Sequence, residues 1–282
     1  MLANCRTDLA AESAARLDRE ELSLPGLSMK RETLCGAPLL SLEISGESAA
    51  ARLGKPPGRY YTLELNLPFT RASSGFAAHA SAVAEMIRRC GLPEEGEILV
   101  AALGNPDITP DALGPLCASS VLVTRHLKAG GAPLWRDFAS VSLLRTGVLG
   151  TAGVESAVQI RSLCAELRPA QVLVVDALAG ADAARLCRSI QVCDSGISPG
   201  SGVCNDRRRI DRELLGVPVT AIGVPTVADA AALGGGEKEK SLFVTPRDID
   251  SSVRACARLI AYGINLALHR RLTVEEIDAL IG

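Results

Sequence analysis

The stretch EILVAALGNPDITPDALGP (residues 97–115) indicates the fold class and locates a candidate site. Residues 97–103 are mostly apolar and predict a buried strand, Gly104 begins a turn, and Thr109 followed by a proline fits the N-cap and first position of a helix. In an open α/β sheet, the turn after a strand lies at the carboxyl edge, where ligand sites gather. Asp111 is therefore expected beside such a site, in the first turn of a helix whose positive end favours its ionised form.

The alternation of short β-branched runs with helical stretches continues along the chain. Strands are predicted at 140–144, 171–175, 189–192 and 217–223, and helices at 72–90, 151–167 and in a long last helix that Thr245 is predicted to cap. Two alternating runs, 38–44 and 59–66, predict a small N-terminal antiparallel strand pair. We expect an α/β fold with a mostly parallel central sheet flanked by helices, of the phosphorylase or hydrolase kind, with that strand pair at an edge or in a small subdomain.

Composition favours a globular protein that acts on small molecules or proteins. The 282 residues are 48% hydrophobic, enough for a buried core, and the net charge of −2 gives no general electrostatic reason to bind nucleic acid or an anionic membrane. The nine cysteines form no CxxC pair and have only three histidines to join them, which indicates reduced cytosolic thiols and no metal site. The charged N-terminus and the lack of a long apolar run predict a cytoplasmic protein without a membrane segment, and no cofactor is expected.

A second carboxylate, Asp176, directly follows the apolar run VLVV. In a parallel sheet the end of that strand lies on the same edge as the Gly104 turn. Asp111 and Asp176 can then share a dry crevice, where one pKa rises and the pair acts as acid and base on a water molecule. The alternative is that Asp111 only stabilises a helix start. Asp107, in the middle of the turn, is interpreted as a turn former.

Residues for substrate binding are less clearly marked. The loop SGISPGSGVCN (residues 195–205) contains small residues that allow close approach of a substrate backbone. It matches GxSxG formally, but Pro199 has no backbone N–H to donate to an oxyanion, so a serine hydrolase is rejected. Arg125 and Arg207 are candidates for a pocket that binds an acidic side chain, and the alternative for the arginines at 207–209 is a solvated surface cluster. The alternative for His126 is a packing role. The candidate substrate-binding residues are Arg125, His126, Ser198, Gly200, Ser201, Gly202, Asn205 and Arg207.

Several ordered motifs closely resemble the germination protease of spore-forming bacteria. They are RTDLA (6–10), TPDALGP (109–115), TRHL (124–127), VDALA (175–179), PGSGVCN (199–205), IGVPTV (222–227) and VTPRDID (244–250). More distantly, the pattern GNxxxxxD that ends at Asp111 is similar to that of hydrogenase maturation proteases, which share the α/β architecture. The resemblance implies an endopeptidase that degrades small acid-soluble spore proteins at germination, usually a homotetramer, in the spore core. It places the two important acidic residues at Asp111 and Asp176.

The resemblance also implies self-processing. Family members are made as zymogens that lose a short pro-segment at a site like the substrate site, an acidic residue followed by a hydrophobic one and then Ala. The sequence Asp8-Leu9-Ala10 fits this pattern. Cleavage is therefore expected between Asp8 and Leu9, which leaves a pro-segment of residues 1–8 and a single α/β protease domain of residues 9–282. Ser198 stands where the family commonly has His, so no role for a loop histidine is carried over.

We therefore expect an aspartate-dependent endopeptidase that cuts after an acidic residue. The placement of Asp111 in a first helical turn argues that it takes the proton of the water, with Asp176 as the protonated partner. One alternative is a metal-dependent maturation protease, which activity in a strong chelator would exclude. The other is an inactive relative that binds spore proteins without cutting them, which fragments of a substrate protein would exclude.

Overall fold

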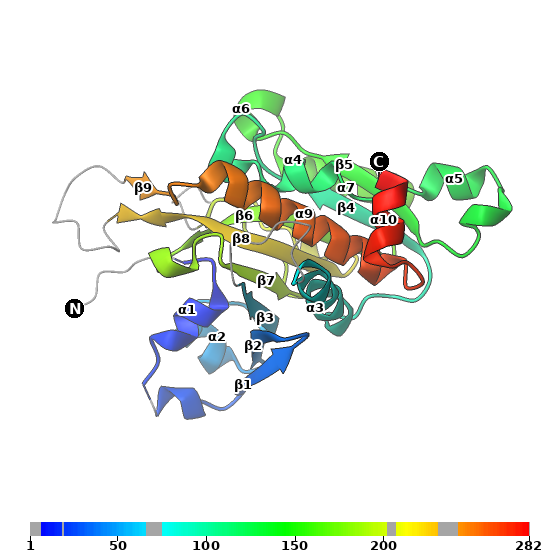
Figure 1. Cartoon of the computed structure of the whole chain (residues 1–282). Helices are drawn as coiled ribbons and strands as arrows, with labels where there is room; N and C mark the ends of the chain where they lie inside the picture. Colours follow the sequence, from blue (N-terminus) through cyan, green and yellow to red (C-terminus); the bar gives the residue numbers. More distant parts are fainter. Residues whose placement is uncertain (1–6, 19, 66–74, 202–206, 231–241, 282) are drawn as a thin grey trace.

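The computed structural model describes residues 7–18, 20–65, 75–201, 207–230 and 242–281. These residues form one nine-stranded sheet with helices on both faces (Figure 1). The strand order is β1-β2-β3-β7-β8-β6-β4-β5, and β9 pairs with β8. The strands are β1 (Leu27–Leu34), β2 (Ala37–Ile44), β3 (Gly58–Glu64), β4 (Glu97–Ala102), β5 (Ser140–Arg145), β6 (Gln171–Gly180), β7 (Ser189–Cys193), β8 (Val219–Asp229) and β9 (Phe243–Val244).

The helices differ widely in length. They are α1 (Ala10–Ala15), α2 (Glu47–Leu53), α3 (Phe76–Arg89), α4 (Leu113–Ala118), α5 (Arg125–Ala129), α6 (Leu149–Ala152), α7 (Ser156–Leu167), α8 (Arg212–Leu215), α9 (Ile249–Leu268) and α10 (Val274–Ile281). In Figure 1, α9 crosses the sheet beside α3, and α1 and α2 lie with the strands β1 to β3.

The sheet confirms the α/β class but is mixed in direction. Strands β8, β6, β4 and β5 run parallel to one another, as the sequence predicts. Strand β7 is antiparallel to both β3 and β8. The predicted strand pair exists as β2 and β3, with β1 added antiparallel at the edge, and it joins the central sheet through β7. A parallel arrangement therefore holds for the half of the sheet that carries the predicted aspartates.

The two faces of the sheet pack against different elements. Along β6, Leu173 and Val175 belong to the apolar cluster that contains α3 and α9. Val172 and Val174 belong to the cluster on the other face, with α1, α2 and α7. Successive side chains of a strand point to opposite faces, so Asp176, two positions after Val174, lies on this second face. The long helix α9 buries its apolar side on the first face, as its sequence pattern predicts.

The turn after β4 differs from the predicted helix start. Residues Thr109–Asp111 form a 3-10 turn, and α4 begins only at Leu113. Asp111 therefore does not lie in the first turn of an α-helix, and Thr109 is not an N-cap. The predicted helix 151–167 is likewise divided into α6 and α7, because Gly153 adopts a φ of +67° at the end of α6.

The last long helix also starts later than predicted. Thr245 does not cap α9, which begins at Ile249 with Asp248 in the cap position. The carboxylate of Asp248 accepts a hydrogen bond from the Ser252 hydroxyl at 3.0 Å. The local pattern identified the helix, whereas its first turn depends on side-chain contacts.

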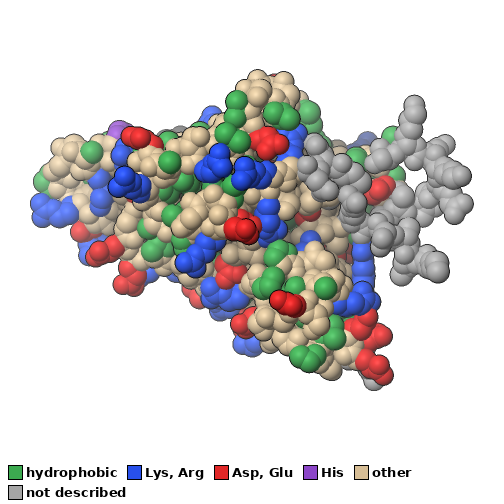
Figure 2. Space-filling view, turned by 180° about the vertical axis from the view of Figure 1, so that it is seen from behind, with side chains coloured by type: hydrophobic (Ala, Val, Ile, Leu, Met, Phe, Trp, Pro, Cys, Tyr) green, Lys and Arg blue, Asp and Glu red, His purple; other side chains and the backbone are tan. Residues whose placement is uncertain are grey.

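One face of the molecule is mixed in charge. Positive and negative side chains are both spread over the face that Figure 2 shows. Within the described part of the chain, none of the helices has the length and apolar composition needed to cross a bilayer.

Candidate active site

The candidate site lies where β4 ends and β6 continues. Strand β4 pairs with β6 as far as Val175, whose carbonyl accepts a hydrogen bond from the Leu103 N–H at 2.9 Å. The sequence predicts that β6 ends at Val175, but the strand continues to Gly180 and stays paired with β8. Asp176 therefore lies in a part of β6 that is paired with β8 but no longer with β4. A cavity of about 550 Å³ opens there and is lined by both Asp111 and Asp176.

Gly104 turns the chain away from the sheet and places Asp111 at this cavity. Its φ is +115°, and a Cβ at this position would lie 2.0 Å from the carbonyl oxygen of Asp111, so only glycine fits. The Asn105 N–H donates to Asp111 Oδ2 at 2.9 Å and to the Asp111 carbonyl oxygen at 3.1 Å. The carboxylate of Asp111 is thus held by the backbone of the turn.

Asp176 is the more deeply buried carboxylate, with 5% of its surface exposed. Its Oδ1 accepts a hydrogen bond from the Ala177 N–H at 2.9 Å. Burial, followed by the negative charges of Asp111 and Asp8, raises the pKa of Asp176 well above its usual value, against the Ala177 N–H and the charge of Arg207. Burial also raises the pKa of Asp111, against a backbone hydrogen bond and Arg207. Two such carboxyl groups favour a state in which one is protonated and the other ionised.

Asp8, near the start of the described residues, lies in this site. Asp8 lines the same cavity as the two aspartates. Its N–H donates to the Ala179 carbonyl at 2.9 Å, and the Ala179 N–H donates to Asp8 Oδ2 at 2.8 Å. The Ser201 hydroxyl donates to Asp8 Oδ1 at 2.7 Å. Asp8 is therefore bound along the end of β6, with its carboxylate held by two donors.

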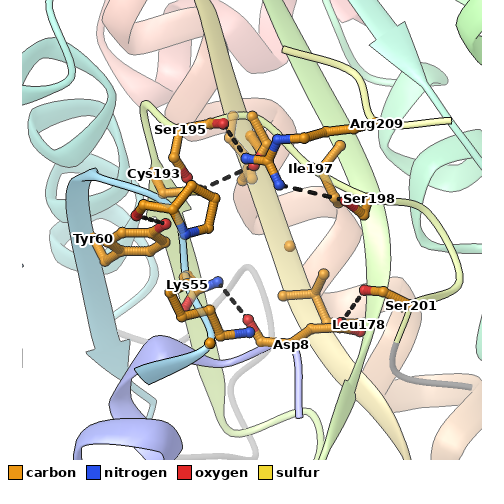
Figure 3. Close-up of a pocket in the computed structure, with 17 residues that line it drawn as sticks. Asp8, Lys55, Tyr60, Leu178, Cys193, Ser195, Ile197, Ser198, Ser201 and Arg209 are labelled. Carbon is orange, nitrogen blue, oxygen red and sulfur yellow. Dashed lines mark hydrogen bonds between the residues drawn. The ribbon is translucent and has the colours of Figure 1, made fainter. Parts of the chain in front are cut away.

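A second cavity, of about 180 Å³, shares Asp8 and Leu178 with the first. Figure 3 shows Asp8 between Lys55 and Ser201, with a dashed line for the hydrogen bond from the serine. The Lys55 Nζ donates to the Thr7 carbonyl at 2.7 Å. Burial lowers the pKa of Lys55, while the nearby charge of Asp8 opposes this shift. The segment is thus held from both sides.

Some predicted substrate-binding residues lie at these two cavities. Gly200 and Arg207 line the larger cavity, and Ser198 and Ser201 line the smaller one. Ser198 also faces the guanidinium of Arg209, with 3.4 Å between its Oγ and an arginine nitrogen. Gly202 and Asn205 fall outside the described residues.

Arg125 and His126 lie elsewhere. Arg125 Nε pairs with Glu97 Oε2 at 2.8 Å, and Glu97 is the first residue of β4. His126 is exposed on α5. The cavity is at the opposite end of β4, so both residues lie at the amino edge of the sheet, and neither lines the two cavities. The structure does not bring them to the predicted aspartates.

Two residues at the site were not predicted, Lys55 and Gln191. Gln191 lies in β7 with 6% of its surface exposed, and it contacts the backbone around Asp8. A polar residue inside the apolar run SIQVC is the kind of signal that identified Asp176, and it was available in the sequence. Lys55 follows a short helix and carries no such signal.

Two carboxylates at the edge of an α/β sheet, beside a bound peptide segment, define a candidate peptidase. The sequence model for germination protease matches residues 4–239. Germination proteases of Clostridium perfringens and Caldanaerobacter subterraneus are 34% and 36% identical to this chain, and the alignments cover 99% and 98% of both partners. That of Bacillus mycoides is 34% identical over 96% of this chain and 76% of its own length. The chain belongs to the germination protease family, and it is a peptidase.

A solved structure with partial likeness is the NiFe hydrogenase maturation protease HycI from Thermococcus kodakarensis. It is 19% identical in sequence, with a TM-score of 0.38, and the match covers 62% of this chain and 94% of that one.

Proposed function

We propose that this protein is an endopeptidase that degrades small acid-soluble spore proteins during germination and cuts them after an acidic residue. Family membership supports a protease role in germination. The observation that carries the cleavage specificity is the binding of the Asp8 carboxylate by Ser201 and the Ala179 N–H, beside the cavity of the two aspartates. The protein acts in the cytoplasm of the spore core as a homotetramer.

In this proposal the two aspartates share the proton transfers of peptide hydrolysis. Asp111, the less buried of the two, is ionised and takes a proton from the attacking water. Asp176, whose pKa is raised more strongly, is protonated and gives its proton to the leaving amine. The positive charge of Arg207 at the cavity stabilises the ionised form of whichever aspartate lacks the proton.

The protein is made as a zymogen that cuts itself between Asp8 and Leu9. Asp8 already lies at the cavity, and Leu9 is fully buried in the apolar cluster with α1 and α7. Cleavage there separates residues 1–8 from a chain whose new first residue stays anchored in that cluster. Until then, Thr7 and Asp8 occupy the place of a substrate.

The test is to incubate the full chain with a small acid-soluble spore protein and to identify fragments by mass spectrometry. We expect cuts after an acidic residue that is followed by a hydrophobic residue and Ala. The Asp176→Asn chain, incubated in parallel, should yield no fragments. A complex that forms without any fragments would make the protein a binder of spore proteins and refute the proposal.

A strong chelator in the same incubation tests the metal-dependent alternative. Within the described ranges, no group of three or more His, Cys, Asp or Glu side chains is arranged to hold a metal ion. We therefore expect the cleavage rate to be unchanged by the chelator. Loss of cleavage that returns when a divalent metal is added would refute water attack assisted by the aspartates alone.

A further inference from the structure

We infer that Gln191 is a catalytic residue that binds the carbonyl oxygen of the peptide bond being cut. This inference rests on the proposed function, because it treats residues 7–10 as the chain's own substrate. The Gln191 Nε2 donates to the backbone carbonyl oxygen of Asp8 at 3.2 Å. That carbonyl belongs to the bond between Asp8 and Leu9. The donor therefore already contacts the oxygen on which negative charge develops when water attacks.

The orientation of the Gln191 side chain is fixed. Its Oε1 accepts a hydrogen bond from the Ala10 N–H at 2.7 Å. A carboxamide has an oxygen that only accepts and a nitrogen that only donates, so the Ala10 contact turns the nitrogen toward Asp8. Only 6% of Gln191 is exposed, and a fixed donor in such a dry place stabilises an oxyanion better than one in water.

The register of the sheet places Gln191 and Asp176 on the same face, two strands apart. Gly223 of β8 is paired with Asp176 of β6 on one side and with Gln191 of β7 on the other. Paired residues point to the same face, and two strand spacings put their Cα atoms about 9–10 Å apart. A Cβ at Gly223 would lie 2.6 Å from Leu178 Cγ, so glycine leaves room for Leu178, which lines both cavities with Asp8.

Two further contacts hold the peptide unit that precedes the bond. Lys55 donates to the Thr7 carbonyl at 2.7 Å, and the Asp8 N–H donates to the Ala179 carbonyl at 2.9 Å. With the Asp8 carbonyl also bound by Gln191, the bond has little freedom to rotate. Holding the bond in this way lowers the entropic cost of bringing the reacting groups together.

Hydrolysis of the bond between Asp8 and Leu9 uses both aspartates and Gln191. The water oxygen forms a bond to the carbonyl carbon of Asp8, its proton goes to Asp111, and the C=O electron pair moves to the oxygen held by Gln191. When the C–N bond breaks, that electron pair returns to re-form C=O, and the Leu9 nitrogen takes the proton of Asp176. The products are a carboxyl group on Asp8 and a free amine on Leu9.

Gln191→Met tests the inference, because methionine has similar length and no N–H donor. The readout is the first-order rate at which the full chain loses residues 1–8, followed by intact mass. Removing one oxyanion donor typically slows a reaction about 10²–10³-fold, and we expect a slowing of that size. The matched control is Gln171→Met, another buried glutamine, whose Nε2 donates to Thr220 Oγ1 at 2.8 Å at the far end of β6. Its rate should stay near that of the wild type.

Gln191→Glu gives a second readout that a structural role would not produce. A carboxylate only accepts hydrogen bonds, whereas a protonated carboxyl group has one O–H to donate. The rate of Gln191→Glu relative to the wild type should therefore increase as the pH falls. If Gln191→Met does not fold, the pH series of Gln191→Glu tests the role of Gln191 by itself.

The outcomes separate the inference from the proposed function. A wild-type chain that never cleaves itself refutes the proposed function. A wild type that cleaves, with Asp176→Asn inert and Gln191→Met as fast as the wild type, overturns the role of Gln191 alone. Equal slowing of Gln171→Met and Gln191→Met, or a pH-independent rate ratio for Gln191→Glu, overturns it as well.

Discussion

Replacing Asp176 with asparagine is expected to stop cleavage and to stabilise the fold at the same time. Asparagine keeps the size of the side chain and the Oδ1 acceptor that receives the Ala177 N–H at 2.9 Å. It has no proton to give to the leaving amine. An acid–base group contributes about 10²–10⁴-fold to a rate, so self-cleavage should slow by at least about 100-fold.

The gain in stability follows from the raised pKa of Asp176. In the unfolded chain this carboxyl group loses its proton at its ordinary pKa, while the folded state holds the proton to higher pH. The free energy of unfolding therefore falls as the pH rises from the ordinary value toward the folded-state pKa. Each unit of elevation corresponds to about 1.4 kcal/mol. Asparagine does not ionise, so the free energy of unfolding of Asp176→Asn does not fall in this way. The variant should therefore melt at a higher temperature than the wild type at neutral pH.

Thermal unfolding from acid to neutral pH measures this difference. The comparison uses chains whose intact mass shows the same N-terminus, and the Asp107→Asn chain controls for loss of a surface charge. The stability difference of Asp176→Asn should shrink as the pH falls from the folded-state pKa of Asp176 toward the ordinary aspartate pKa. Near-normal cleavage would remove Asp176 from the mechanism, and a pH-independent difference in melting would refute the buried-carboxyl reasoning.

Three further substitutions test the assignment of the site. Asp107→Asn should change the cleavage rate by no more than about twofold, because Asp107 is exposed and does not line the cavity, and a large loss would mean that the wrong aspartate was chosen. Ser201→Ala should raise KM for cuts after acidic residues about 10- to 100-fold, because a hydrogen bond to a charged group such as the Asp8 carboxylate contributes about 1.5–3 kcal/mol. An unchanged KM would contradict this binding role. Gly104→Ala should lower the melting temperature and abolish cleavage, because the Cβ of the alanine would lie 2.0 Å from the Asp111 carbonyl oxygen. A stable, active variant would show that the turn differs from the one described.

The parallel part of the sheet was predictable because its signals are local. The runs at β4 and β6 are apolar and β-branched, and short connections between strands and helices favour parallel neighbours. That reasoning placed Asp111 and Asp176 at one edge, and both line one cavity. It did not predict that β6 continues past Asp176. The extension depends on pairing with β8, which lies more than forty residues later in the chain.

The predicted arginine pocket shows the limit of motif reasoning. Arg125 lies within the motif TRHL of the family resemblance, but it is at the amino end of β4 in an ion pair with Glu97. Arg207 came from a charge cluster and does line the cavity. Charge alone does not indicate which edge of a sheet a residue occupies, because that depends on the direction of the strand before it.

The sequence by itself determined the α/β class and predicted that Asp111 and Asp176 share one edge of the sheet, because periodicity, turn residues and short motifs each depend on a few neighbouring positions. The bond expected to be cut came from the family resemblance. Only the tertiary structure decided that Asp8 lies beside those aspartates and that Gln191, 183 positions away, contacts its carbonyl. The physical reason is that hydrogen bonds between strands join residues without regard to their distance along the chain. A single row, Asp176, Gly223 and Gln191, exists only once β6, β8 and β7 have paired in register.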